Sequence, residues 1–346
     1  MKTFHKILSL LVLFCFSLTA FGQKTEEAKK LVSQGIALND SGKYDQAIEK
    51  YKLAMAADSL YPNSYYETGY TLFTSGREKE AIPYLEKLLL IAPKAGGGYD
   101  ILGSIYDDDN QPDKAIEYYK KGIAVNPEYQ RLHFNIAITY YKTGKYAESE
   151  SEAIEAIKLD PRHASSHRIY GLALYAQHKE PLAILPLCNF LLLQPKSKLA
   201  APVYALIDST FKQQGGKNIV LTTNDIKGKD ISPLTLSKIS VNLAVTTRDS
   251  LMKKGDMKSV EQMMVQLKVL FTFMGNISKK MPDNKEFFWK YYADYFSKLA
   301  QSDSMPAFTH YITLEVYNDE DVAWFKDHDA SIKDFSKWID DTKRNF

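Results

Sequence analysis

The chain has 346 residues, of which 45% are hydrophobic, 25% charged and 12% aromatic, and this composition argues against intrinsic disorder. Without Lys2 and Lys6 at its start, the chain holds 42 basic and 42 acidic residues, so it has no electrostatic footprint for nucleic acid. Beyond the first apolar run, no segment is long enough to span a bilayer, which predicts no integral membrane segment in the mature chain.

Residues 1–22 have the pattern of a secretory signal peptide. A basic start at Lys2 and Lys6 is followed by a short apolar run and by small residues at Ala20 and Gly22. This order of regions predicts cleavage after Gly22, and the run is too short to cross a bilayer with margin. The alternative is a buried N-terminal helix.

The cysteines refine this expectation. Cys15 follows Phe14, whereas lipoprotein signals resemble a pattern with a small residue at that place, so lipidation is not expected. Cleavage would leave Cys188 alone, and one cysteine cannot close an internal disulfide. We therefore expect an exported, non-lipidated bacterial protein, in the periplasm, associated with the outer membrane or outside the cell.

A repeat with a period of 34 residues follows. The segment SGKYDQAIEKYKLAMAADS at 41–59 has a counterpart, TGKYAESESEAIEAIKLDP, at 143–161, three periods further on. Five units fit one unbroken frame, and they start at residues 28, 62, 96, 130 and 164. Small residues recur once per unit at Gly35, Gly69, Gly103, Ala137 and Gly171. A fixed period of this length indicates a repeat architecture.

Each unit is predicted to form two helices. Apolar or small residues occur at helical spacing before and after a turn, which reads SGK at 41–43, SGR at 75–77 and TGK at 143–145. Glycine there ends the first helix in a conformation that other residues resist. A proline near the end of four units prevents the second helix from continuing.

These features resemble the tetratricopeptide repeat family, which has small residues at positions 8, 20 and 27, a large apolar residue at 24 and proline at 32. The third unit matches at Gly103, Ala115, Tyr119, Gly122 and Pro127. The resemblance implies an all-α, right-handed solenoid of five helix-turn-helix units. It departs from the family at position 4, where tryptophan is replaced by Leu31, Tyr65, Tyr99, His133 and His167.

The second helix of the fifth unit is unusual. Its sequence LAILPLCNFLLL, at 182–193, is apolar nearly all round, and a helix of this kind must be buried. The last repeat of a solenoid otherwise needs a polar outer face. We therefore predict two regions, 23–197 and 198–346, with the second docked on the last repeat as a cap and Cys188 in the core between them.

The C-terminal region reads as mainly helical. KLAAPVYALIDSTFKQQ at 198–214 begins like another first helix, and NIVLTTND at 218–225 is typical of a short strand. Further helices are expected at 234–253, 259–274, 284–301, 306–317 and 331–343. The segment EFFWKYYADYFSKLA at 286–300 presents a wide aromatic face, which favours a packed core over a ligand platform.

No motif for chemistry is recognisable. Phosphate-binding, zinc-binding and nucleophile-elbow patterns are missing from the sequence, so we expect no enzyme, no cofactor, no metal site and no catalytic residues. His163 and His167 are four residues apart, but a packing role is favoured over metal binding. The acidic run NDEDVAWFKDHDA at 318–330 is interpreted as a helix start with a solvated face.

The resemblance also implies where a partner would bind. In the family, the first helices line a concave surface that holds an extended peptide or a partner helix. The corresponding residues in this chain are Tyr66, Tyr70, Phe73, Arg131, Phe134, Asn135, Ile138, Tyr141, Arg168 and Tyr175. Members that bind a terminal carboxylate use a clamp of Lys, Asn and Arg, and this chain has only Arg131 and Asn135 in comparable places.

We therefore predict an exported interaction or scaffold protein whose aromatic groove binds an apolar or mixed segment of a protein partner. Two alternatives stay open at this point. The rings of the groove could be covered by the chain itself, or the protein could be an enzyme or small-ligand-binding protein whose site lies in 198–346, with the repeats as a docking arm.

Overall fold

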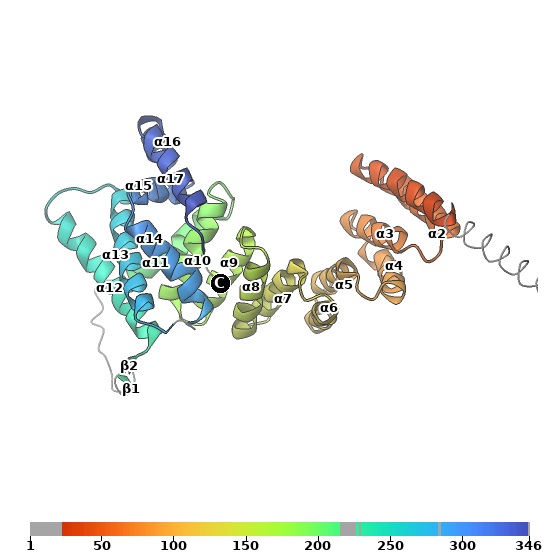
Figure 1. Ribbon diagram of the computed structural model, residues 1–346, viewed down its shortest axis with the longest axis horizontal. Coiled ribbons are helices and arrows are strands. Elements are labelled where there is room, and N and C mark those ends of the chain that lie inside the picture. Colours follow the sequence, from red (N-terminus) through yellow and green to blue (C-terminus); the bar gives the residue numbers. More distant parts are fainter. Residues whose placement is uncertain (1–22, 215–225, 228–229, 283–284, 345–346) are drawn as a thin grey trace, which may run out of the picture. The chain divides into compact units, whose positions relative to one another are not determined.

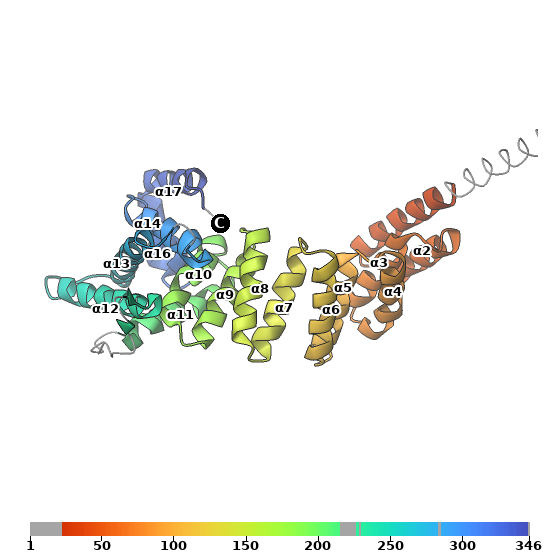
Figure 2. The same cartoon turned by 60° about the horizontal axis from the view of Figure 1, so that its bottom comes forward.

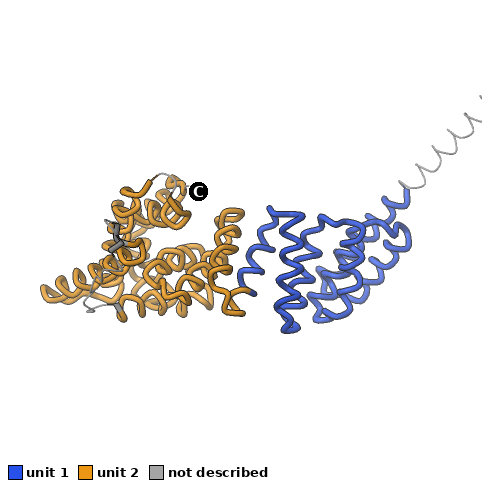
Figure 3. The backbone as a smooth tube through the Cα atoms, turned by 90° about the horizontal axis from the view of Figure 1, so that it is seen from below, with its two compact units in different colours: residues 1–139 blue, residues 140–346 orange. Residues whose placement is uncertain are grey.

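A computed structural model describes residues 23–214, 226–227, 230–282 and 285–344, and most of these lie in helices (Figure 1). The chain divides into two compact units at residues 139 and 140, inside one helix (Figure 3). Unit 1 comprises the described residues up to 139, and unit 2 those from 140 onward. The predicted signal peptide, residues 1–22, lies outside the described residues. The boundary expected at 197 and 198 stays a prediction.

Unit 1 is a stack of helices in chain order (Figure 2). A first helix covers residues 23–40. The others are α2 (Tyr44–Ala57), α3 (Pro62–Thr74), α4 (Glu78–Ile91), α5 (Gly96–Asp108), α6 (Pro112–Val125) and α7 (Gln130–Lys142), whose last three residues belong to unit 2. Helices α3, α5 and α7 begin at 62, 96 and 130, where the sequence places the repeat starts, so the predicted frame is confirmed.

Small residues allow close packing of the two helices of a repeat. A Cβ atom built on Gly35 would lie 2.3 Å from the Tyr51 ring, and one on Gly103 would lie 2.3 Å from the Tyr119 ring. Gly69 faces Leu85 in the same way, at 2.4 Å. These separations are far below van der Waals contact, so a larger side chain would push the helices apart.

The turn inside each repeat contains one residue in the left-handed region. Glycine occupies it at Gly42, Gly76 and Gly144, with φ of 72°, 77° and 75°. The same position holds Asn110, at φ 57°, and His178, at φ 59°. The five residues are 34 positions apart, so each turn has the same backbone shape, even where the sequence lacks the glycine that marks it.

Position 4 of the repeat forms a recurring hydrogen bond. The Tyr65 hydroxyl donates to the Ser59 carbonyl at 3.0 Å, and the Tyr99 hydroxyl to the Pro93 carbonyl at 3.2 Å. In the next two units, His133 Nε2 lies 3.0 Å from the Pro127 carbonyl, and His167 Nε2 lies 2.9 Å from the Pro161 carbonyl. Each bond ties a first helix to the last turn of the preceding repeat. A side-chain donor is therefore what replaces tryptophan in units two to five.

Unit 2 begins with the remaining repeat helices and continues into the C-terminal region (Figure 1). Its first helices are α8 (Tyr146–Leu159), α9 (Ala164–Ala176), α10 (Glu180–Leu193) and α11 (Ala200–Gln214). After a two-stranded antiparallel hairpin, β1 (Ile226–Lys227) with β2 (Asp230–Ile231), come the others: α12 (Pro233–Met252), α13 (Ser259–Lys279), the π-helical turn η1 (Trp289–Ala293), α14 (Asp294–Ala300), α15 (Met305–Thr313), α16 (Asn318–Asp327) and α17 (Asp329–Asp341). The strand predicted at 218–225 lies outside the described residues.

Helix α10 lies at the centre of unit 2. It is buried over nearly its whole length, including Cys188, and burial raises the pKa of that thiol well above its usual value. Helix α9 packs on one side of it, while α11, α12, α15 and η1 also contact it. Because α11, α12, α15 and η1 come from beyond residue 197, the C-terminal region covers part of the apolar surface of α10.

The aromatic segment at 286–300 lies in the core, as expected. Phe288, Trp289, Tyr291, Tyr292, Tyr295 and Phe296 are all buried. His167 of α9 is packed among them, with its ring stacked on Tyr291 at 5.9 Å and edge-on to Tyr292 at 5.8 Å. The Tyr292 hydroxyl lies 2.6 Å from His167 Nδ1. Because Nε2 faces a carbonyl, it must carry the proton, and Nδ1 therefore accepts from Tyr292.

The left-handed turn residue can be tested by mutation. We expect Gly144→Ala to lower the free energy of unfolding of the protein by about 1–2 kcal/mol, because a Cβ atom is strained at φ 75°. Gly255→Ala is the matched control in the same unit, since Gly255 has open space around it and no positive φ. It should be neutral or stabilise by about 0.4–1 kcal/mol through the unfolded chain. Equal effects in chemical denaturation would contradict this account.

The burial of His167 predicts a pH dependence of stability. Burial lowers the pKa of His167 from 6.5 to about 3. Below pH 6.5 His167 therefore binds a proton in the unfolded chain but not in the folded chain. Its contribution to the free energy of unfolding is fully present above pH 6.5 and is lost as the pH falls toward 3. Within this window we expect the free energy of unfolding to fall by about 1.4 kcal/mol for each pH unit of acidification.

Denaturation curves of the wild type and of His167→Gln, measured between pH 7.5 and 4, would check this prediction. The variant should be less stable at pH 7.5 and should lose less stability on acidification. His178→Asn serves as the control, since the His178 side chain is 92% exposed and asparagine tolerates its positive φ. Parallel curves for the wild type and His167→Gln would show that His167 is not the titrating group.

Candidate functional site

The predicted groove residues of unit 1 lie on α3 and α7. On α3, the rings of Tyr66 and Tyr70 are stacked, with centroids 6.2 Å apart and planes 15° apart. Tyr70 is 37% exposed, whereas Tyr66 and Phe73 are partly buried and pack against the core of the unit. Tyr70 is therefore the most accessible of these three rings. Phe134 and Ile138 on α7 are partly buried too.

The Tyr66 ring is accommodated by a glycine on the next first helix. A Cβ atom on Gly97 of α5 would lie 2.7 Å from the Tyr66 ring. Glycine at this place allows the ring to lie against the backbone of α5, and burial raises the pKa of the Tyr66 hydroxyl to about 12. The run of three glycines that opens α5 thus has a packing role at Gly97, which the repeat pattern alone does not indicate.

Arg131 and Asn135 converge on a buried carboxylate that the sequence does not single out. Asp100 on α5 is only 1% exposed. Its Oδ1 accepts from Asn135 Nδ2 at 2.6 Å, and its Oδ2 lies 3.0 Å from Nε of Arg131, whose side chain is 59% exposed. Burial raises the pKa of the Asp100 carboxyl, while Arg131 and Asn135 act in the opposite direction. A buried carboxylate requires such partners.

This network bears on the mode of binding. Arg131 and Asn135 are the residues in places comparable to the carboxylate clamp, and both are engaged by Asp100. They are already partnered within the chain, so they are poorly suited to capture the terminal carboxylate of a peptide. The arrangement instead fixes α7 against α5, and Tyr70 is the exposed ring of this surface.

The remaining predicted residues belong to unit 2. The ring of Tyr141 packs at a tilt against Tyr146, with centroids 5.5 Å apart, and the Tyr175 hydroxyl lies 3.3 Å from Oγ of Ser209 on α11. Arg168 on α9 is partly buried, and its Nε has no hydrogen-bond partner among the described residues. Burial lowers the pKa of Arg168. Tyr175 is thus partly tied down by the helix that follows the fifth repeat.

The repeat is recognisable by comparison with known proteins. Two sequence profiles, both described as tetratricopeptide repeat, match residues 32–98 and 108–173. The first of these segments begins in unit one, and the second ends within the first helix of unit five. The chain carries tetratricopeptide repeats.

Its relatives match only part of their own length. The TPR repeat-containing protein YpiA of Bacillus subtilis is 30% identical over 145 residues, which are 42% of this chain and 33% of YpiA. The photosystem I assembly protein Ycf3 of Prochlorococcus marinus is 33% identical over 91 residues, which are 25% of this chain and 53% of Ycf3. The chain therefore spans about a third to a half of these relatives.

Solved structures also have similarity to part of this chain. A crystal structure of MamA has 22% identity and a TM-score of 0.44, over 49% of this chain and 93% of MamA. YrrB, described as a TPR protein with an unusual peptide-binding site, has 22% identity and a TM-score of 0.43, over 54% of this chain and 97% of YrrB.

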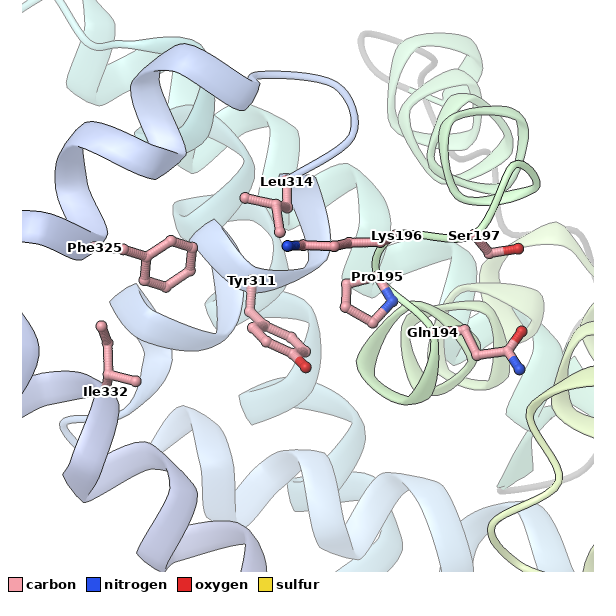
Figure 4. Close-up of a pocket in the computed structure, with 8 residues that line it drawn as sticks. All are labelled: Gln194, Pro195, Lys196, Ser197, Tyr311, Leu314, Phe325 and Ile332. Carbon is pink, nitrogen blue, oxygen red and sulfur yellow. The ribbon is translucent and has the colours of Figure 1, made fainter.

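Unit 2 contains a cleft that sequence reasoning missed. It is a cavity of about 690 Å³ between the end of α10 and helices α15, α16 and α17 (Figure 4). Its lining residues are Gln194, Pro195, Lys196, Ser197, Tyr311, Leu314, Phe325 and Ile332. No signal in the sequence joins these residues, because they come from four separate segments and follow no common period.

A second feature of unit 2 corrects the interpretation of the acidic run. Asp321 in that run is fully buried rather than solvated. Its Oδ1 lies 2.6 Å from Nδ1 of His310, and its Oδ2 accepts from the Thr313 hydroxyl at 2.9 Å. The expected solvated face fails here because α16 packs on α15, which brings Asp321 against these two partners.

His310 also lines a cavity of about 510 Å³. An aspartate that orients a histidine is half of the arrangement used for general-base catalysis. The one hydroxyl in this lining belongs to Thr309, and it donates to the Met305 carbonyl. Within the described residues, the cavity is thus lined by a histidine that the buried Asp321 orients, but by no hydroxyl or thiol free to act as a nucleophile.

Two further properties concern the described residues only. Among them, no helix is long and apolar enough to cross a membrane, and no group of three or more His, Cys, Asp or Glu side chains is placed to hold a metal ion. His163 and His167 do not converge, since His163 Nδ1 lies 2.7 Å from the Ser166 hydroxyl and both nitrogens of His167 are engaged.

Proposed function

We propose that the repeats bind a protein partner through the exposed apolar side chains of their first helices, and that the protein serves as an interaction or assembly factor. The presence of tetratricopeptide repeats supports binding to a protein partner. One relative, Ycf3, is named for the assembly of photosystem I, which agrees with an assembly role. This role requires no catalysis and no cofactor.

A single observation carries this proposal. Ile36 and Tyr70 occupy the same position in the first two repeats, and each is 37% exposed. The Tyr66 ring, which is stacked on Tyr70, adds to the apolar surface that these two residues form. Aromatic anchors of this kind lose little conformational entropy when they bind and dominate many interfaces. The occupant we propose is an extended apolar or mixed segment, because Asp100 engages the residues that would hold a terminal carboxylate.

The test is partner capture by crosslinking and pull-down from the native cell envelope. We expect Tyr70→Ala to weaken capture of the partner by at least about tenfold, as for a typical interface hot spot. Tyr44→Ala is the matched control, since Tyr44 is 39% exposed but lies on α2, a second helix. If both variants capture the partner as the wild type does, the surface of the first helices is not the binding site.

We also propose that the protein is exported without a lipid anchor. The basis is the sequence pattern of residues 1–22 and the phenylalanine that precedes Cys15. Intact-mass analysis of the protein purified from the cell envelope should show a mature chain that starts at Gln23 and carries no added lipid mass. A chain that still starts at Met1, or a chain that starts at Cys15 with a lipid, would overturn this proposal.

A ligand site in the C-terminal region is a second candidate function. The cleft beside α10 favours it, since its volume of about 690 Å³ lies in the range of small-molecule sites, roughly 300–1,000 Å³. The two functions are compatible, because the first helices of unit 1 and this cleft share no residue.

A further inference from the structure

The cleft beside α10 continues into a second cavity of similar size. The second cavity also has a volume of about 690 Å³ and shares Tyr311, Phe325 and Ile332 with the first. Figure 4 shows the rings of Tyr311 and Phe325 on neighbouring helices, facing the chain at Pro195. We call the two cavities together the α10–α17 cleft. Its further apolar lining is Leu192, Leu193, Leu314, Phe335 and Ile339.

The walls of the cleft carry an excess of positive charge. Arg162, Lys343 and Arg344 line the second cavity and Lys196 the first, against one carboxylate, Asp340. None of these four cations forms an ion pair with the described residues. An apolar cleft with unpaired cations at its edge is complementary to a molecule with an anionic group and an apolar body.

Arg344 is the most strongly positioned of these cations. Its guanidinium carbon lies 3.6 Å from the centroid of the Tyr295 ring and 4.9 Å from that of Tyr291. Its Nη2 donates to Oδ1 of Asn189, a residue of α10 that is 1% exposed. The rings and the amide therefore hold the guanidinium in one orientation.

The other end of this guanidinium lacks an acceptor. Nη1 of Arg344 is buried and has no hydrogen-bond partner among the described residues. A buried N–H of a charged group that lacks an acceptor is costly, and a carboxylate is an anionic acceptor that fits the planar guanidinium. Arg344 therefore lines the cleft, is held in place by its neighbours and has one N–H group without an acceptor among the described residues.

One helix of the cover of the cleft, α17, has few buried residues. Helices α16 and α17 stand at the edge of unit 2 (Figure 1), and in α17 only Phe335 is buried. With so few buried residues, α17 can separate from α15 more easily than α16, which Asp321 holds to His310 and Thr313, and this would give a ligand a route of entry.

We propose that the α10–α17 cleft binds a long-chain aliphatic carboxylate, with its carboxylate on the guanidinium of Arg344 and its chain along Tyr311, Phe325 and the leucines of α10. Arg162 and Lys343 line the same cavity as Arg344 and add to the attraction. This inference does not rest on partner binding by the repeats, and Tyr70→Ala is expected to leave it unchanged.

The test uses dodecanoate as the probe, with the delipidated protein of residues 23–346 and isothermal titration calorimetry below the micelle concentration. Dodecanol and dodecyltrimethylammonium have the same chain with a neutral or a cationic head. We expect one molecule of dodecanoate to bind at least tenfold more tightly than either. Equal affinity for dodecanol, or no binding of dodecanoate, would overturn the proposal. Tighter binding of dodecyl phosphate than of dodecanoate would overturn the choice of carboxylate.

Variants locate the site. Arg344→Gln should weaken dodecanoate binding by about tenfold or more, the effect of losing one charge-assisted hydrogen bond. Lys337→Gln is the matched control, because it removes one positive charge from α17 at an exposed residue that does not line the cleft. Unchanged affinity in a folded Arg344→Gln protein would place the ligand elsewhere.

A second variant covers the case in which Arg344→Gln fails to fold. The double variant Arg162→Gln with Lys343→Gln alters two exposed side chains and leaves the contacts of Arg344 intact. It should lower the affinity for dodecanoate several-fold and leave that for dodecanol unchanged. An unchanged preference of this variant for dodecanoate over dodecanol, together with failure of Arg344→Gln to fold, would count against the proposed end of the cleft.

Discussion

The close contact between a glycine on the first helix and a large side chain on the second is the constraint on which the repeats depend. Gly35, Gly69 and Gly103 each lie so near to a tyrosine or leucine that no added carbon would fit. Gly171 repeats the contact with Leu187, at 2.6 Å. Because this contact sets the helix spacing, it also sets which residues of the first helix face outward. Those residues are free to vary, and they carry the proposed binding surface.

The fourth repeat shows how the same constraint can be met differently. It has Ala137 in place of the glycine, and Ala153 in place of the large residue, and both are fully buried. Enlarging one member of such a pair requires that the other be reduced, since interiors are close-packed. The rule that the repeats obey is therefore one of combined volume, and a search for glycine alone would miss it.

In the fifth repeat, the residue at position 4 forms two hydrogen bonds instead of one. His167 Nε2 ties α9 to the Pro161 carbonyl, as its counterparts do in other units, while Nδ1 accepts from Tyr292 in the C-terminal region. A tyrosine at this position could not do both in the same way, because it has a single polar atom. Histidine therefore extends a contact within the repeats into one that joins them to the helices beyond, and its burial in neutral form follows.

Sequence alone determined the period, the ten repeat helices and the aromatic core segment. The 34-residue spacing and the helical periodicity are local properties of the sequence, and they recur in every unit. It also placed Tyr66, Tyr70 and Phe73 on one first helix. Only the tertiary structure decided that Asp100 engages Arg131 and Asn135, that Asp321 is buried against His310, and that Arg344, which has one unpartnered N–H group among the described residues, lines an apolar cleft. Each of these depends on burial and on partners from distant segments. Desolvation makes such pairings necessary, and the order of residues does not show which groups will be desolvated.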